Sequence, residues 1–117
     1  MLKGIDKIIS PDLLKIMMEM GHGDEIVISD GNFPAASIAQ RLVRLDGHNA
    51  PEVIEAMLKL LPLDTYAEIT GKYTDAKPEF LERYEFYERA KNAYAVVYTG
   101  ESALYANVIL KKGVVTD

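Results

Sequence analysis

The chain has 117 residues, of which 49% are hydrophobic and 26% charged, a balance typical of one soluble globular domain. The formal net charge of −5 argues against a nucleic-acid partner, because binding of a phosphate backbone needs a basic face. The absence of cysteine excludes a disulfide scaffold, a thiolate zinc site and a cysteine nucleophile.

Neither a secretory signal nor a membrane span is predicted. The opening MLKGIDKIIS lacks the apolar core of a signal peptide. No apolar run approaches the roughly 18 residues that a membrane helix needs. We therefore expect a cytoplasmic protein with no membrane partner. Lys111 and Lys112 are too few for a basic patch, and we interpret them as a solvated strand end.

A helix is predicted over residues 11–20. Ser10 can cap its first turn, Pro11 suits its first position, and Gly21 can end it. The spacing of the apolar side chains indicates one buried face. The residues of that face are Leu13, Leu14, Ile16, Met17 and Met20.

Strands and helices alternate along the rest of the chain. Strands are predicted over residues 25–29, 41–45, 65–69, 94–98 and 107–110, and helices over 51–61 and 79–93. A polar stretch over 70–78 indicates a loop. Strands separated by helices predict an α/β fold: a single layered domain with a largely parallel sheet flanked by helices.

Two histidines are candidates for proton transfer. His22 lies between two glycines, after a helix and before a strand, which leaves room for a ligand to approach. An imidazole titrates near neutral pH and can therefore give and take protons. The alternative is that His22 stabilises the carboxyl end of the helix dipole. His48 is interpreted as structural or solvated.

Asp30 follows the strand at 25–29, at the end where ligands bind in open α/β sheets. The alternative is an Asx turn with Gly31 and Asn32. Because the strand separates His22 from Asp30, either the loop before the strand folds back along it or a neighbouring subunit completes the site. A metal site of His22, Asp24 and Asp30 matches no established ligand spacing.

The segment Tyr105–Ala106–Asn107 offers a phenol and an amide, which can both donate to and accept from sugar hydroxyls. The alternative is a tyrosine packed against the core beside an asparagine in a turn. Neither a GxGxxG nor a Walker loop is present, and there is no GxSxG nucleophile elbow.

Two stretches of the chain are similar to the fucose mutarotase and ribose pyranase family. They are ISPDLLKIMMEMGHGDEIVISDGNFPA and FYERAKNAYAVVYTGESALYANVILKKGV. The resemblance implies a mutarotase-like domain over residues 1–117. Its members interconvert the anomers of L-fucose, or the pyranose and furanose forms of D-ribose, without cofactor or metal. The resemblance of both stretches favours L-fucose as the substrate.

The resemblance also implies roles for individual residues. His22 matches the proton-donating histidine, and the sugar-binding positions are Asp30, Arg83, Tyr105, Ala106 and Asn107. Our own hypothesis adds Tyr105 as a second proton relay. Members form ring-shaped homo-oligomers with sites completed between subunits, which provides a route for His22 to meet Asp30.

The chain departs from the family in one place. Members carry a longer middle before the position of Arg83, so this arginine corresponds either to the ligand-binding one or to one on a helix surface. Two other functions stay open: a non-catalytic sugar-binding or assembly protein with a degenerate pocket, and a metal-dependent sugar isomerase.

Overall fold

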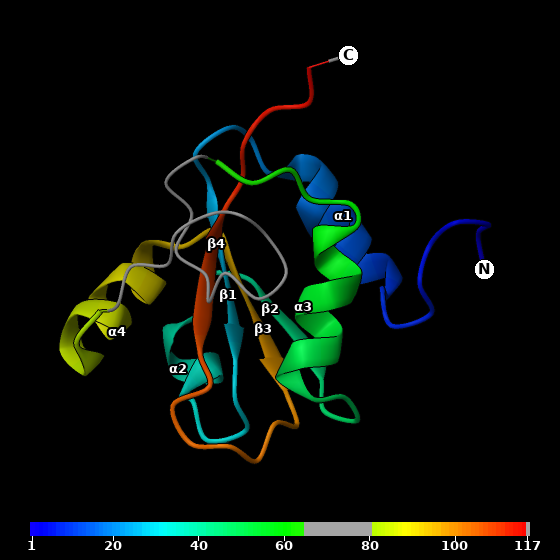
Figure 1. The fold of residues 1–117 in the computed structure, drawn as a ribbon. Coiled ribbons are helices and arrows are strands. Elements are labelled where there is room, and N and C mark those ends of the chain that lie inside the picture. Colours follow the sequence, from blue (N-terminus) through cyan, green and yellow to red (C-terminus); the bar gives the residue numbers. More distant parts are fainter. Residues whose placement is uncertain (65–80, 117) are drawn as a thin grey trace.

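A four-stranded sheet forms the centre of the protein in a computed structural model that describes residues 1–64 and 81–116 (Figure 1). The strands are β1 (Glu25–Ser29), β2 (Leu42–Leu45), β3 (Ala95–Thr99) and β4 (Val108–Lys111), in the order β2-β3-β1-β4. β3 runs parallel to both β1 and β2, whereas β4 runs antiparallel to β1. The predicted α/β fold with a largely parallel sheet is confirmed. The strand predicted at 65–69 and the loop at 70–78 lie outside the described residues.

Helices cover both faces of this sheet. α1 (Pro11–Glu19) and α3 (Ala50–Leu58) lie on one face, and α2 (Ala35–Ile38) and α4 (Arg83–Asn92) on the other (Figure 1). Ile26 and Ile28 of β1 face the first pair, while Val27 faces the second. β1 is therefore buried on both sides, as expected of a central strand in a parallel sheet. Among the helices of the described residues, none is long and apolar enough to cross a membrane.

Two helices, α1 and α3, begin with a side-chain cap. The Ser10 hydroxyl accepts a hydrogen bond from the Leu13 N–H at 3.2 Å, as expected for α1. α1 ends at Glu19, and Gly23 rather than Gly21 adopts a positive φ, of 89°. α3 begins with a capping box between Asn49 and Glu52.

Two helix boundaries differ from the prediction by more than one residue, and one helix was not predicted. α3 ends at Leu58, before the expected Leu61, because its last turn tightens onto the Met57 carbonyl. α4 begins at Arg83, since Glu82 is extended; residues 79 and 80 lie outside the described part of the chain. α2 was not predicted, because its four residues give no periodic signal and no side-chain cap.

Lys112 is not a solvated strand end. Its Nζ donates to the carbonyl oxygens of Met17 and Met20 at 2.7 and 2.6 Å. These carbonyls belong to the carboxyl end of α1, where backbone acceptors lack helical partners and the dipole attracts a cation. Lys112 therefore stabilises the end of α1. The sequence pattern did not predict this role.

Replacing Lys112 with methionine is expected to lower the free energy of unfolding by about 1–3 kcal/mol, because two charge-assisted hydrogen bonds are lost while the apolar stem is kept. Urea unfolding at fixed protein concentration measures the change. Lys111→Met is the matched control, since Lys111 lies 4.0 Å from a Glu25 carboxylate that already binds Arg89. Equal losses in the two variants would contradict the proposed role of Lys112.

Candidate functional site

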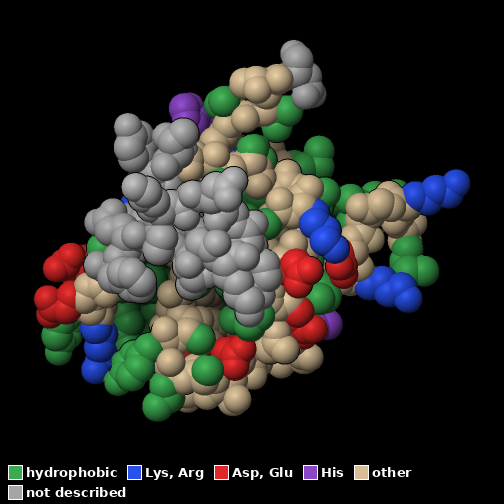
Figure 2. All heavy atoms as spheres, viewed as in Figure 1, with side chains coloured by type: hydrophobic (Ala, Val, Ile, Leu, Met, Phe, Trp, Pro, Cys, Tyr) green, Lys and Arg blue, Asp and Glu red, His purple; other side chains and the backbone are tan. Residues whose placement is uncertain are grey.

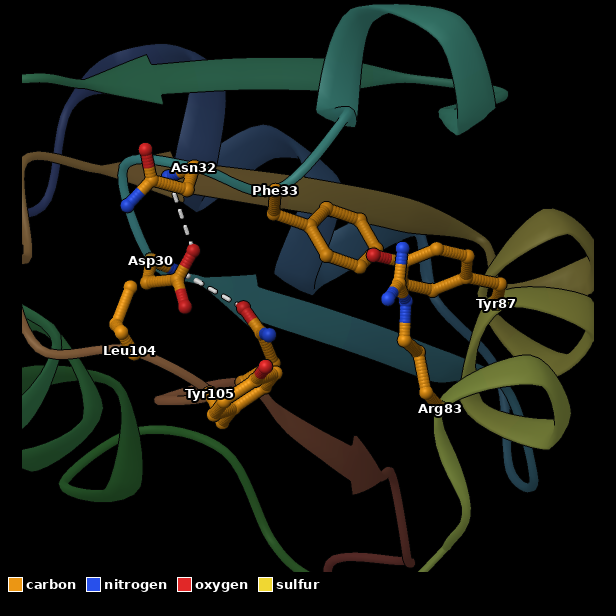
Figure 3. Close-up of a pocket in the computed structure, with 8 residues that line it drawn as sticks. Asp30, Asn32, Phe33, Arg83, Tyr87, Leu104 and Tyr105 are labelled. Carbon is orange, nitrogen blue, oxygen red and sulfur yellow. Dashed lines mark hydrogen bonds between the residues drawn. The ribbon is translucent and has the colours of Figure 1, made fainter.

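A cavity of about 210 Å3 lies at the carboxyl ends of β1 and β3, beside the start of α4 (Figure 3). Three segments line it: the turn after β1, the site loop (residues 101–107, between β3 and β4) and the first turns of α4. The lining side chains are Asp30, Asn32, Phe33, Arg83, Tyr87, Leu104, Tyr105 and Asn107. This position, outside the carboxyl ends of parallel strands, is the usual ligand site of open α/β sheets.

Asp30 joins two of these segments. Its carboxylate accepts the Asn32 N–H on Oδ1 at 3.0 Å and the Ala106 N–H on Oδ2 at 3.2 Å. Its own N–H donates to Oδ1 of Asn107 at 2.8 Å (Figure 3). Asp30 thus forms the Asx turn considered as the alternative, and it also lines the cavity. With only 3% of the residue exposed, it fixes the geometry between the turn and the site loop.

Tyr105 is not packed against the core, so that alternative is wrong. The residue is 81% exposed, and Leu104 beside it is 70% exposed. Figure 2 shows hydrophobic side chains exposed over this loop, at the bottom of the view. Tyr105 has a φ of 59°, a left-handed conformation that costs a bulky residue roughly 1–2 kcal/mol. The bonds of Ala106 and Asn107 to Asp30 hold it there.

Arg83 and Tyr87 enter the cavity from one face of α4. They are one helical turn apart, and the guanidinium carbon of Arg83 lies 5.6 Å from the centre of the Tyr87 ring (Figure 3). The interaction with Tyr87 raises the pKa of the Arg83 guanidinium above its ordinary value. Arg83 is therefore placed at the cavity as a permanent cation, and not on a remote helix surface.

His22 lies at the opposite end of β1 from Asp30. The loop before β1 is tied to the carboxyl end of β4, since Gly23 N–H donates to the Lys112 carbonyl at 2.8 Å. It therefore does not fold back along β1, whose five residues span about 16 Å. His22 does not reach the cavity of its own subunit.

The surroundings of His22 are polar and open. Its Nε2 lies 3.3 Å from Oδ2 of Asp64, and 62% of the imidazole side chain is exposed. The carboxyl end of the α1 dipole is occupied by Lys112, so the helix-dipole alternative for His22 is not supported. Among residues 1–64 and 81–116, no three His, Asp or Glu side chains gather as a metal site would require, because Asp30 is remote from His22 and Asp24.

His48 has the structural role that was expected. Its Nδ1 lies 3.1 Å from Oε1 of Glu52, one turn along α3. The Glu52 carboxylate also accepts the Asn49 N–H at 2.9 Å. His48 therefore belongs to the capped start of α3.

Several lining residues were missed by the sequence analysis. Phe33 is 5% exposed and packs its edge against Phe86 and Tyr87, with ring centres 5.9 and 5.5 Å apart. Tyr87 could have been found from its spacing of four residues from Arg83, because this spacing places both side chains on one face of a helix. Phe33 and Leu104 gave none, because apolar side chains are expected in any core or loop.

These features define a small α/β protein with a compact cavity of polar and aromatic side chains at the carboxyl edge of its sheet. Residues 3–115 match the RbsD / FucU transport protein family, and the chain belongs to that family.

Alignments with fucose mutarotases cover nearly the whole chain. The fucose mutarotases of Mus musculus and Homo sapiens are 47% and 46% identical to it, and the alignments cover 96% and 97% of this chain and 94% of each relative. The alignment with the mouse protein has 143 positions, more than the 117 residues of this chain. The relative therefore contains residues that this chain lacks.

Solved structures show the same fold. The fucose mutarotase of Streptococcus pneumoniae in complex with L-fucose is 46% identical, with a TM-score of 0.90 over 98% of this chain and 100% of that chain. RbsD of Bacillus subtilis complexed with D-ribose is 25% identical, with a TM-score of 0.79 over 99% and 100% of the two chains.

Proposed function

We propose that this protein is a cofactor-independent sugar mutarotase that interconverts the anomers of L-fucose by general acid/base ring opening. The observation that carries the proposal is the convergence of Asp30, Arg83, Tyr105 and Asn107 on one cavity, in a chain closely related to fucose mutarotases. L-Fucose is favoured over D-ribose because the fucose-bound structure is the nearer of the two in sequence and in fold.

Mutarotation of a cyclic hemiacetal needs two proton movements. One group removes the proton of the anomeric hydroxyl, and another protonates the ring oxygen as the bond between the anomeric carbon and that oxygen breaks. The open aldehyde then rotates its carbonyl face, and the same steps in reverse close the ring. No electrons are gained or lost, so a redox cofactor is not needed. A positioned acid–base pair accelerates such a step by about 10²–10⁴-fold.

The lining residues suit binding and orientation of the sugar. The Asp30 carboxylate accepts one backbone N–H on each oxygen, which leaves further lone pairs for sugar hydroxyls. Asn107 uses Oδ1 for Asp30, and its Nδ2 group supplies donors. Tyr105 adds a hydroxyl that can relay a proton, and Arg83 adds a fixed positive charge.

The proton donor is assigned to His22 of a neighbouring copy. His22 is too far from the cavity of its own chain, and its exposed imidazole is available to another subunit. The Asp64 carboxylate lies 3.3 Å from Nε2 of the imidazole and favours one ring orientation. The active form is therefore a homo-oligomer, built as a ring in which copies share sites. The cysteine-free composition suits the reducing cytoplasm.

Anomer exchange by saturation-transfer NMR tests this function directly. The protein is expected to accelerate exchange between the anomeric protons of L-fucose more than those of D-ribose or D-galactose. Binding of L-fucose without any increase in exchange rate would contradict catalysis and support the second candidate, a sugar-binding protein with a degenerate pocket. The difference in length from the mouse relative is the observation that favours this second candidate.

Tyr105→Phe tests the role of the hydroxyl group separately from that of the aromatic ring. The variant keeps the aromatic ring but removes the proposed proton relay and one hydrogen-bonding group. We expect the exchange rate of L-fucose to fall by about tenfold. Tyr94→Phe is the control, because Tyr94 precedes β3 at the other end of the sheet, beneath Arg41. An unchanged rate in Tyr105→Phe would remove this hydroxyl from the mechanism.

A further inference from the structure

We infer that Glu101 is a positioning residue, which holds the site loop against the amino end of α3 and thereby fixes Tyr105. The inference rests on the proposed function, since it concerns the geometry of the same cavity. Glu101 itself is not among the residues that line the cavity.

The backbone of Glu101 attaches the start of the site loop to the sheet. Its carbonyl accepts the Gly31 N–H at 2.8 Å. Its N–H donates to Oγ1 of Thr99 at 3.2 Å, and that hydroxyl donates to the Ser29 carbonyl at 2.6 Å. Thr99 is fully buried, so the hydrogen bond from its hydroxyl to Ser29 is shielded from water. The loop therefore leaves β3 in a direction set by the end of β1.

The side chain of Glu101 connects the loop to α3. Oε1 accepts the N–H of Ala50, the first residue of that helix, at 3.2 Å, and Oε2 accepts the N–H of Ala103 at 3.0 Å. The capping box satisfies the N–H groups of Asn49 and Glu52, while Pro51 has none. Glu101 therefore completes the cap, and its negative charge lies at the positive end of the helix dipole.

Two anchors thus enclose the strained part of the loop. Glu101 holds Ala103, and Asp30 holds Ala106. Between them lie Leu104 and Tyr105, the latter with its φ of 59°. Unfavourable backbone conformations persist only where the surroundings determine them. Without the first anchor, Tyr105 can relax away from the cavity.

Glu101→Gln is the test, because the Ala50 and Ala103 N–H groups bind different carboxylate oxygens, and the amide replaces one of these oxygens by an NH2 group that cannot accept. We expect the KM for L-fucose to rise by about tenfold, with a smaller fall in kcat. The backbone amides of residues 103–107 are expected to show lower heteronuclear NOE values, which report faster motion of the loop.

Glu52→Gln is the matched control at the same helix end. Its carboxylate binds the Asn49 N–H but does not touch the site loop. Both variants are expected to lower Tm by a few degrees, as loss of a helix cap does. Only Glu101→Gln is expected to change KM and the amide NOE values. Equal effects of the two variants on these readouts would show that Glu101 only caps the helix.

A second variant keeps the test decisive if Glu101→Gln fails to fold. Glu101→Asp keeps the charge but is too short to span from Ala50 to Ala103, so it is expected to raise KM with less loss of stability. If the unmodified protein fails to accelerate anomer exchange, the proposed function is wrong. The NOE values and the affinity for L-fucose then still decide whether Glu101 positions the loop.

Discussion

His22→Ala is expected to slow the protein-catalysed anomer exchange of L-fucose by about 100-fold or more, because the group assigned to protonate the ring oxygen is lost. The imidazole is exposed, so its removal is expected to leave unfolding by urea nearly unchanged. Saturation-transfer NMR measures the rate. His48→Ala is the control, since His48 contacts Glu52 at the start of α3. A rate as fast as that of the unmodified protein would remove His22 from the mechanism.

Mixing two inactive variants tests whether copies share a site. His22→Ala keeps an intact cavity, and Tyr105→Ala keeps an intact histidine. When the two are unfolded and refolded together in equal amounts, about a quarter of the shared sites combine both intact halves. Activity is therefore expected to return in the mixture and not in either variant alone. No recovery would contradict the assignment of His22 to a neighbouring copy.

Gly100→Ala is expected to lower the free energy of unfolding by about 3 kcal/mol or more. An added Cβ would lie 2.0 Å from the carbonyl oxygen of Asp46, which is backbone and cannot rotate away. The N–H of Gly100 also donates to the His48 carbonyl at 2.8 Å, so the segment cannot shift without losing a hydrogen bond.

Gly47→Ala is the matched control for this substitution. Gly47 lies in the adjacent turn, and an added Cβ there meets nothing within 4 Å. Its free energy of unfolding is expected to change by less than about 1 kcal/mol. Urea unfolding compares the two variants, and similar losses would show that the close approach of Gly100 to Asp46 is not rigid.

Local signals were enough to predict most elements of the fold. β1 was predicted at its observed bounds, because a short β-branched run between two turns is a strong strand signal. α4 was predicted to begin at residue 79, whereas Glu82 is extended and the helix begins at Arg83. Arg89 of this helix forms a bidentate ion pair with Glu25 at the start of β1, a contact between residues distant in the chain. Pairing of this kind has no local signature.

The site was less predictable, because it depends on the ends of distant segments. Asp30 and Asn107 are 77 positions apart in the sequence and yet share a hydrogen bond of 2.8 Å. The resemblance to known sequences, and not spacing, brought these two residues together in the prediction. The separation of His22 from Asp30 did follow from the length of β1. That the preceding loop stays at its own end depends on contacts with Lys112, which no sequence rule predicts.

The placement of His22 and Asp30 at opposite ends of β1 has a kinetic consequence. Under the proposed assignment of His22 to a neighbouring copy, a lone subunit contains every group that the reaction requires but cannot bring them to one substrate molecule. Dilution below the dissociation constant of the proposed oligomer is then expected to reduce total activity more steeply than the protein concentration.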